Sequence, residues 1–455
     1  MDYQKKLNDY AARKAELTIK NDTIPAKLFT DLGVYRGLRD SYGKGVLTGL
    51  TSVSRIDAFK IEHGERVPID GRLYYRDHSI EELIDKYVDE GFAFEKVTYL
   101  LLFGELPTDE EAQEFIQVLE KYRNLPRNFT RDVIMKATSG DIMNSMTRSI
   151  LTLASYEKNI SSNEIPDVIR ESLTLIATFP MLAVYAYHAY NHYENYGSMY
   201  IHRPSKTRSA AENILRMLRP DKKFTKTEAR VLDACLLLHM EHGGGNNSTF
   251  TTRVVTSSGS DTYSSIAAAM SSLKGPRHGG ANIKVMEMFD DIRAHVKDPY
   301  DEEAIEDYLR KIVDGEAFDG KGLIYGMGHA VYSISDPRER ILKRFVTELA
   351  EEKNLENDLA LYENVETIAP RVIAQKRNIL KGVNPNVDFY SGFVYQMLGI
   401  PRELYTPLFA TARVTGWCAH RLEELVGDSK IIRPAYMSVV KIGDSVDPNM
   451  PDNVI

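Results

Sequence analysis

The sequence predicts a mostly α-helical protein with two domains, and three observations support this prediction. The chain of 455 residues exceeds the usual size of a single hydrophobic core, so two domains are the default. Helix starts and stops recur along the chain, whereas strand patterns are limited to a short hairpin within 66–76. Histidines and arginines stand in Gly-rich turns between the expected helices, where side chains and backbone N–H groups can converge on a ligand.

A capping box marks the first well-defined helix. Ser79 is followed three residues later by Glu82, which predicts a helix that runs through Val88. A second helix is expected over 93–103, because the segment 104–107 contains both Gly and Pro and ends the pattern.

Another capping box, formed by Thr225 and Glu228, opens a helix whose residues 229–238 are apolar on almost every side. We therefore expect this helix to be buried. Small residues dominate 264–273, which permits close helix packing before the stop at 274–276. Helices are also expected at 301–313, 337–352 and 404–426, and the polar first 45 residues are expected to be helical and to face a partner.

The composition is that of an ordinary globular enzyme, with 43% hydrophobic and 27% charged residues. A net charge of −8 and a pI near 5.9 argue against nucleic-acid or anionic membrane partners. Cys235 and Cys418 have apolar neighbours, which favours buried reduced thiols over a disulfide. No apolar run approaches the length of a membrane span, and the first residues lack the apolar core of a signal peptide. We therefore expect a cytoplasmic protein.

Two histidines are framed by glycines. His278 lies in the motif Gly-Pro-Arg-His-Gly-Gly (275–280), and His329 lies in the motif Gly-Met-Gly-His (326–329). Glycines on both sides let the backbone approach a ligand closely and permit positive φ angles. Taken alone, the His278 motif favours the alternative of a tight turn between helices that carries a surface histidine. The Gly-x-Gly pair does not indicate a dinucleotide site, because the full fingerprint after a strand is missing.

Asp388 lies between the apolar residues Val387 and Phe389, and it is a candidate general base. Apolar neighbours favour desolvation, which raises the pKa of a carboxyl group and makes it a better base. The alternative is that Asp388 is the N-cap of the helix that follows. Both interpretations are compatible with the sequence.

Three arginines are candidates for binding an anionic substrate. Arg338 follows Asp-Pro at an expected helix start, and Arg413 stands on an otherwise apolar helix where it needs a carboxylate partner. The same argument applies more weakly to Arg433. The alternatives are a solvated arginine at position 338 and structural ion pairs with Glu423 or Glu424 for the other two.

His239 and His242 are spaced for a shared helix face, which raises the possibility of a metal site. The pair lacks the Glu of His-Glu-x-x-His, and no cluster of Cys or carboxylates surrounds it. We therefore expect no metal.

Taken together and in this order, these motifs resemble citrate synthase. The resemblance runs from about Gly45 to the C-terminus. It rests on seven blocks, at 71–76, 101–107, 239–242, 275–282, 326–329, 336–338 and 386–388. It implies an all-α fold of two domains: a large, dimer-forming domain from 1–283 and 393–455, and a smaller, mobile, CoA-binding domain from 284–392.

The resemblance also implies an activity. The protein would condense acetyl-CoA with oxaloacetate and water to citrate and CoA, through enol and citryl-CoA intermediates, with acetyl-CoA as co-substrate and no tightly bound cofactor. Asp388 would remove a methyl proton from acetyl-CoA, and His278 would stabilise the enol at the thioester oxygen. His329 would polarise and protonate the ketone of oxaloacetate.

The binding residues follow from the same resemblance. Oxaloacetate would be held by His242, Arg338 and Arg413, with Arg433 reaching across a homodimer into the neighbouring site. Gly326, Gly328 and Ala330 would meet the adenine moiety of CoA. The family commonly has a basic residue where this chain has Ser333, so Lys376, Arg377 or Lys381 would substitute for it. The family often has Glu at the position of Gly243.

Two alternatives remain. A 2-methylcitrate synthase uses propionyl-CoA, and one methylene gives a discrimination of only about 1–3 kcal/mol. A non-catalytic metal- or acid-binding protein would use the same histidines without turnover. We do not expect an ATP-dependent citrate-cleaving enzyme, because these 455 residues leave no room for the nucleotide-binding and phosphohistidine regions.

Overall fold

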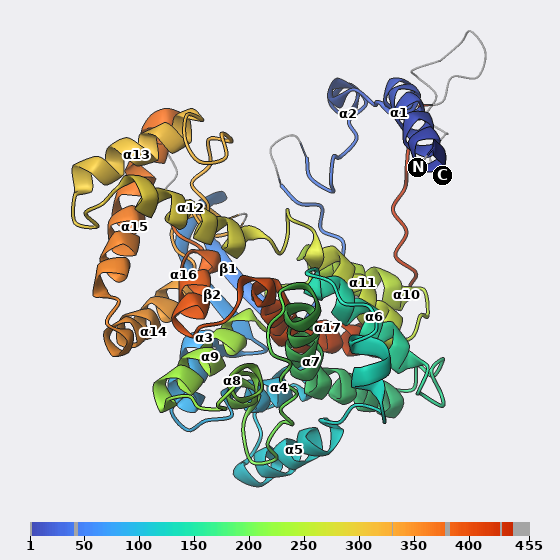
Figure 1. Cartoon of the computed structure of the whole chain (residues 1–455). Coiled ribbons are helices and arrows are strands. Elements are labelled where there is room, and N and C mark those ends of the chain that lie inside the picture. The colour runs from blue at the N-terminus through green and yellow to red at the C-terminus, as the bar shows by residue number, and fades with distance from the viewer. Residues whose placement is uncertain (1, 41–43, 330, 378–382, 428–429, 440–455) are drawn as a thin grey trace. The chain divides into compact units, whose positions relative to one another are not determined.

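The computed structural model describes residues 2–40, 44–329, 331–377, 383–427 and 430–439 (Figure 1). The chain divides into a small unit, Met1–Leu50 with Arg433–Ile455, and a large unit, Thr51–Ile432. The fold is helical apart from one small sheet, as the sequence predicts. The expected domain boundaries near 283 and 393 stay a prediction.

The small unit contains α1 (Asp2–Asp22) and α2 (Ala26–Asp31), so the expectation of helices in the first 45 residues is confirmed. The side chains described along α1 are exposed, and its mixed charges suit that exposure.

The sheet of the large unit is larger than the sequence indicated. The antiparallel strands β1 (Ser54–Glu62) and β2 (Glu65–Tyr75) pair from Ser54 opposite Tyr75 to Glu62 opposite Glu65. The short β3 (His78–Ser79) pairs antiparallel with the end of β2. The expected hairpin within 66–76 therefore captured only the second strand. His63 and Gly64 form the connecting turn with positive φ angles, which matches the twist of the strands.

The capping boxes lie where the sequence predicts them. Ser79 and Glu82 open α3 (Ile80–Tyr87), and Thr225 and Glu228 open α9 (Lys226–His239). The helix expected at 93–103 is α4 (Ala93–Phe103), which ends at the left-handed Gly104. The remaining helices before the first site segment are α5 (Asp109–Tyr122), a π-helical turn at Thr130–Ile134, α6 (Ile142–Ala154), α7 (Ile165–Glu194) and α8 (Ala210–Leu218).

The helices from α10 onward carry Arg338, Asp388 and Arg413. They are α10 (Asn247–Ser257), α11 (Thr262–Lys274), α12 (Ala281–His295), α13 (Glu302–Asp314), α14 (Pro337–Lys353), α15 (Glu356–Arg377), α16 (Val387–Met397), a 3₁₀ turn at Arg402–Leu404 and α17 (Tyr405–Val426). The helices expected at 264–273, 301–313, 337–352 and 404–426 are confirmed within a few residues.

α7 corrects the expectation that no segment resembles a membrane span. By length and composition α7 is apolar enough to cross a membrane, with a mean hydropathy of 1.3 over its most apolar window. However, 83% of that window is buried inside the protein. A core helix of a globular protein meets the same criterion, and the evidence for a membrane span is weak.

α17 runs through the core of the large unit, where it packs against α4, α7, α9, α10 and α11 (Figure 1). Gly416 allows α17 to approach the segment after α9. A Cβ atom at this position would lie 2.5 Å from the carboxylate Oε2 of Glu241 and closer still to the carbonyl oxygen of Met240. The close approach of these two segments therefore requires glycine.

Replacing this glycine should destabilise the protein. Gly416→Ala forces α17 away from Met240 and Glu241, so we expect a loss of about 1–3 kcal/mol in the free energy of unfolding, the range for overpacking a core. Denaturant unfolding measures it. Gly245→Ala is the control, because a Cβ atom there meets nothing within 4 Å. Equal stability of the two variants would contradict the packing argument.

Candidate active site

Six of the residues singled out from the sequence line one pocket of about 150 Å³ in the large unit. They come from segments far apart in the chain and are His242, His278, His329, Arg338, Asp388 and Arg413. The pocket is also lined by Asn246, Gly279, Asn282, Asn386, Val387 and Phe409. Arg433 belongs to the small unit, where its side chain is exposed.

His278 lies in the turn between α11 and α12. The turn closes through the N–H of His278, which donates to the carbonyl of Gly275 at 2.8 Å. Gly279 is required here, because a Cβ atom would lie 2.9 Å from Thr406 and would overlap the carbonyl of Leu273. The expected Gly-rich turn is thus confirmed, and His278 lines a pocket although Pro276 and Arg277 are exposed.

The hydrogen bonds of His278 assign its proton. The backbone N–H of Ser248 donates to Nε2 of His278 at 3.3 Å, and the hydroxyl of Ser248 lies 3.0 Å from the same nitrogen. Because Nε2 accepts, the proton of the neutral ring is on Nδ1. Burial, and then the charge of Arg413, lower the pKa of His278 to about 4, so the ring is neutral at pH 7.

His329 has the opposite tautomer. Its Nδ1 accepts the backbone N–H groups of Val331 at 3.0 Å and Tyr332 at 3.2 Å. Nη2 of Arg338 lies 3.4 Å from Nε2, so the two shorter contacts at Nδ1 favour a proton on Nε2. Burial, and then the charge of Arg338, lower the pKa of His329 to about 4. His329 is therefore a neutral ring with an N–H donor.

His242 completes the group of histidines. Its ring centroid lies 5.2 Å from that of His329, and its Nε2 lies 3.3 Å from the hydroxyl of Tyr332. Burial, and then Arg338, hold the pKa of His242 well below its usual range. All three pocket histidines are therefore neutral near pH 7.

Asp388 stands in the first turn of α16. The N-cap of this helix is Asn386, whose side-chain oxygen accepts the N–H of Asp388 at 3.0 Å. The alternative in which Asp388 is itself the cap is therefore wrong, because its carboxylate faces the pocket. Burial raises the pKa of Asp388 to about 6, against the opposing charge of Arg338, as expected for a desolvated base.

Arg338 is buried and not solvated. It lies in the first turn of α14, where the N-cap Asp336 accepts its backbone N–H at 3.0 Å and pairs with its guanidinium at 3.0 and 2.7 Å. The other oxygen of Asp336 also accepts the N–H of Val387 at 3.3 Å. One carboxylate therefore holds Arg338 next to the segment that carries Asp388.

Arg413 has no carboxylate partner among the described residues. Its Nε donates to the carbonyl of His239 at 2.6 Å, its guanidinium stacks on Phe409 at 4.6 Å, and its Nη1 is buried without a hydrogen bond. The expected alternative of an ion pair with Glu423 or Glu424 is wrong for Arg413, since both glutamates pair with Arg253.

The Gly-rich segment before His329 is held by the segment before Asp388. The N–H of Gly328 donates to the carbonyl of Asn384 at 2.7 Å. The N–H of Asn386 donates to the carbonyl of Gly326 at 2.9 Å. Both glycines have φ angles above +80°, which disfavour other residues. The segment therefore places His329 beside Asp388.

The expected contacts with CoA stay predictions. Ala330 and Lys381 lie outside the described residues. Of the other candidates to replace a basic residue at Ser333, Lys376 pairs with Asp314 and Arg377 donates to the carbonyl of Gly322 at 2.8 Å.

Metal binding finds no support in the described part of the chain, which contains no group of three or more potential metal ligands. His239 is a core residue: Nδ1 donates to the carbonyl of Cys235 at 2.7 Å, and the ring packs on Phe409.

Three pocket residues were not expected from the sequence: Asn246, Asn282 and Phe409. Asn246 directly follows the three glycines at 243–245, and Asn282 stands two residues after the motif at 275–280, so proximity to glycines was the available indication. Phe409 stands one helical turn before Arg413, a spacing that places both on one face. It is not distinguishable from a core phenylalanine in the sequence.

Comparison with known proteins agrees with this geometry. The family model described as citrate synthase, C-terminal domain, matches residues 41–435. A citrate synthase of Synechocystis is 35% identical over 82% of this chain and 86% of its own length. The 2-methylcitrate synthase 2 of Corynebacterium glutamicum is 31% identical over 86% of this chain and 92% of its own length.

Solved structures give the same result. The citrate synthase of Thermotoga maritima has a TM-score of 0.70 and 30% identity, over 90% of this chain and 97% of that one. The structure of the citrate synthase of Thermoplasma acidophilum is a ternary complex with carboxymethyl coenzyme A and oxaloacetate. It has a TM-score of 0.73 and 27% identity, over 88% of this chain and 96% of that one. The chain belongs to the citrate synthase family.

Proposed function

We propose that this protein is a citrate synthase, which condenses acetyl-CoA with oxaloacetate and water to give citrate and CoA. The observation that carries the proposal is the convergence of a base with a raised pKa, three neutral histidines and two buried arginines on one pocket. A weak carbon acid needs a positioned base and a hydrogen-bond donor at the developing oxyanion, and a dicarboxylate needs cations.

Asp388 is the proposed base. Its carboxylate removes a proton from the methyl group of acetyl-CoA, and a pKa near 6 leaves it ionised at pH 7 while improving its basicity. His278 donates its Nδ1 proton in a hydrogen bond to the thioester oxygen as the enol forms. A neutral imidazole is suited to this role, because its hydrogen bond stabilises the oxygen without requiring a buried charge.

His329 acts on the second substrate. Its Nε2–H polarises the ketone oxygen of oxaloacetate and protonates it as the new carbon–carbon bond forms. Arg338, Arg413 and His242 bind the carboxylates and orient the ketone. Water then hydrolyses the thioester of citryl-CoA and releases CoA.

A second candidate, 2-methylcitrate synthesis from propionyl-CoA, is favoured by the relatives with that name at 30–31% identity. We favour acetyl-CoA because the relative that shares 35% identity is a citrate synthase. A non-catalytic binding protein would leave the pKa of Asp388 and the placement of His329 without a use.

We further propose a cytoplasmic homodimer. The buried free thiols of Cys235 and Cys418 support a reducing compartment. Arg433 is exposed in the small unit, and a partner's pocket is the site at which its charge would be used.

The first test is thiol release from the purified protein with oxaloacetate and either acetyl-CoA or propionyl-CoA. We expect kcat/KM to be higher for acetyl-CoA. A preference for propionyl-CoA would assign the protein to 2-methylcitrate synthesis. The absence of oxaloacetate-dependent release with both thioesters, from a folded sample, would refute the proposed function.

Asp388→Ala tests the base. We expect kcat to fall by about 10²–10⁴, the usual contribution of a general base, while oxaloacetate still binds, because Arg338, Arg413 and His242 are unchanged. Thiol release gives the rate and calorimetry gives the binding. Undiminished turnover would remove Asp388 from the mechanism.

The pH dependence tests the protonation states. Asp388 must be ionised to accept a proton, so kcat/KM for acetyl-CoA should rise as the pH increases through about 6 and level off above 7. The rate should fall about tenfold per pH unit below 5. His278 and His329, with pKa values near 4, should not add a limb between pH 5 and 8. A value of kcat/KM that decreases as the pH is raised from 5 to 7 would contradict this assignment.

A further inference from the structure

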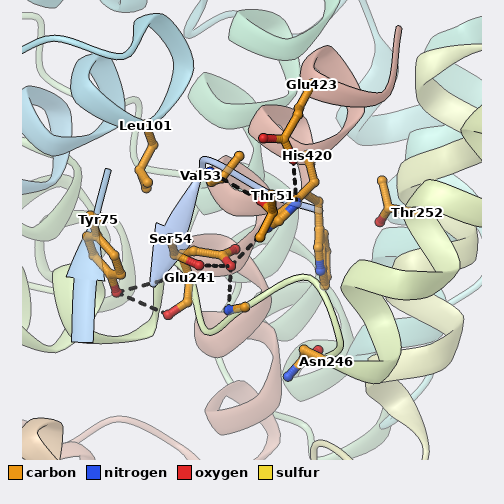
Figure 2. A network of polar contacts seen from close by, with 12 residues as sticks. Thr51, Val53, Ser54, Tyr75, Leu101, Glu241, Asn246, Thr252, His420 and Glu423 are labelled. Atoms are coloured by element: carbon orange, nitrogen blue, oxygen red, sulfur yellow. Dashed lines mark hydrogen bonds and ion pairs between the residues drawn. The ribbon is translucent and has the colours of Figure 1, made fainter. Parts of the chain in front are cut away.

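A fully buried carboxylate lies behind the pocket and has no part in the proposed reaction. Glu241 precedes His242, and its side chain is 0% exposed. Its Oε1 accepts the N–H of Gly243 at 2.6 Å, the hydroxyl of Ser54 at 3.0 Å and Nε2 of His420 at 2.9 Å, whereas Oε2 has no hydrogen-bond partner (Figure 2). Glu241 therefore fixes the segment that carries His242 and keeps one oxygen uncommitted.

The contact with His420 is a hydrogen bond that leaves the charge of Glu241 in place. Nδ1 of His420 lies 3.1 Å from the guanidinium of Arg253, which can only donate. Nδ1 is therefore an acceptor, and the ring proton is on Nε2, directed at Glu241. Arg253 is itself paired with Glu423 and Glu424.

Arg413 lies on the face of α17 that also carries His420. Arg413, Gly416 and His420 are spaced by three and four residues, so they lie on one helix face. Along this face Arg413 contacts the carbonyl of His239, Gly416 lies against Oε2 of Glu241, and His420 contacts Oε1. The uncommitted oxygen of Glu241 therefore lies on the Gly416 side, one helical turn from Arg413.

Arg413 needs a negative charge nearby. A buried cation without a counter-charge is costly, and Arg338 obtains its counter-charge from Asp336. For Arg413 the described residues offer no direct ion pair, and its Nη1 has no partner. Burial lowers the pKa of Arg413 to about 10, and the charge of Glu241 acts in the opposite direction.

We propose that Glu241 is the built-in counter-charge of Arg413: it holds the arginine and the His242 segment in place in the ligand-free protein and limits the affinity for an anionic substrate. This inference rests on the proposed function, in which Arg413 binds a carboxylate of oxaloacetate. Glu241 is a positioning residue that acts through Arg413. The incoming carboxylate joins a site in which a buried anion already offsets part of the positive charge.

Glu241→Gln removes the charge and can keep the three hydrogen bonds, because all three donors meet one oxygen. We expect oxaloacetate to bind more tightly, on the order of tenfold, in calorimetry without a thioester. The ligand-free variant should melt at a lower temperature and gain more on adding oxaloacetate. If the role of Glu241 were purely structural, the substitution would disturb the His242 segment and weaken the binding of oxaloacetate. Weaker or unchanged binding would therefore overturn the proposal.

Glu423→Gln is the matched control. It removes a carboxylate of α17 from the same hydrogen-bond network, but Glu423 pairs with Arg253 and Ser52. Its affinity for oxaloacetate should stay within about twofold of the wild type. A tenfold gain in this variant as well would show that the effect is not specific to Glu241 and would overturn the proposal.

Glu241→Asp keeps the test decisive if the Gln variant does not fold. The charge is retained and only the bond geometry changes, so affinity should stay within about threefold of the wild type. A change beyond tenfold would show that geometry and not charge sets the affinity. Thiol release from the wild type is measured separately: oxaloacetate binding without turnover would refute the proposed reaction alone, and no oxaloacetate binding would refute both.

Discussion

The positive charge of two arginines buried among apolar helices is the constraint on which the rest of the pocket depends. Arg338 is compensated by Asp336 through a bidentate pair, whereas Arg413 has no direct ion pair among the described residues. Beside these charges, and in a desolvated site, His278 and His329 stay neutral at pH 7. The histidines therefore act as neutral N–H donors toward the oxygens of the enol and the ketone.

The same charges set the pKa of Asp388. Burial raises its pKa, and the two arginines limit the rise to about 6, so the carboxylate is ionised at neutral pH and still basic. Asp336 connects the parts: it pairs with Arg338 and also accepts the N–H of Val387, which begins the helix of Asp388. The anion-binding group and the base are thus held by one buried carboxylate.

Glycines at close contacts allow this convergence. Gly416 lets α17 approach the segment that follows α9, and Gly279 lets the His278 turn fold against α11 and α17. Gly326 adopts a positive φ angle in the segment that pairs with the residues before Asp388. The pocket side chains can meet because the backbone carries no Cβ atom at these three close contacts.

The sequence by itself determined the helical class, the capping boxes at Ser79 and Thr225, and the set of histidines, arginines and aspartate that resembles citrate synthase. These features depend on the spacing of residues that are close together in the chain. The sequence did not determine that Arg338 is buried, that Asn386 is the cap before Asp388, or that the sheet begins at Ser54.

Only the tertiary structure decided the tautomers of His278 and His329 and the placement of Glu241 behind Arg413. The reason is physical: each depends on contacts between residues distant in the chain, such as Ser248 with His278 and Gly416 with Glu241. Protonation and counter-charge are set by such neighbours and by burial, and neither can be deduced from the spacing of residues along one segment.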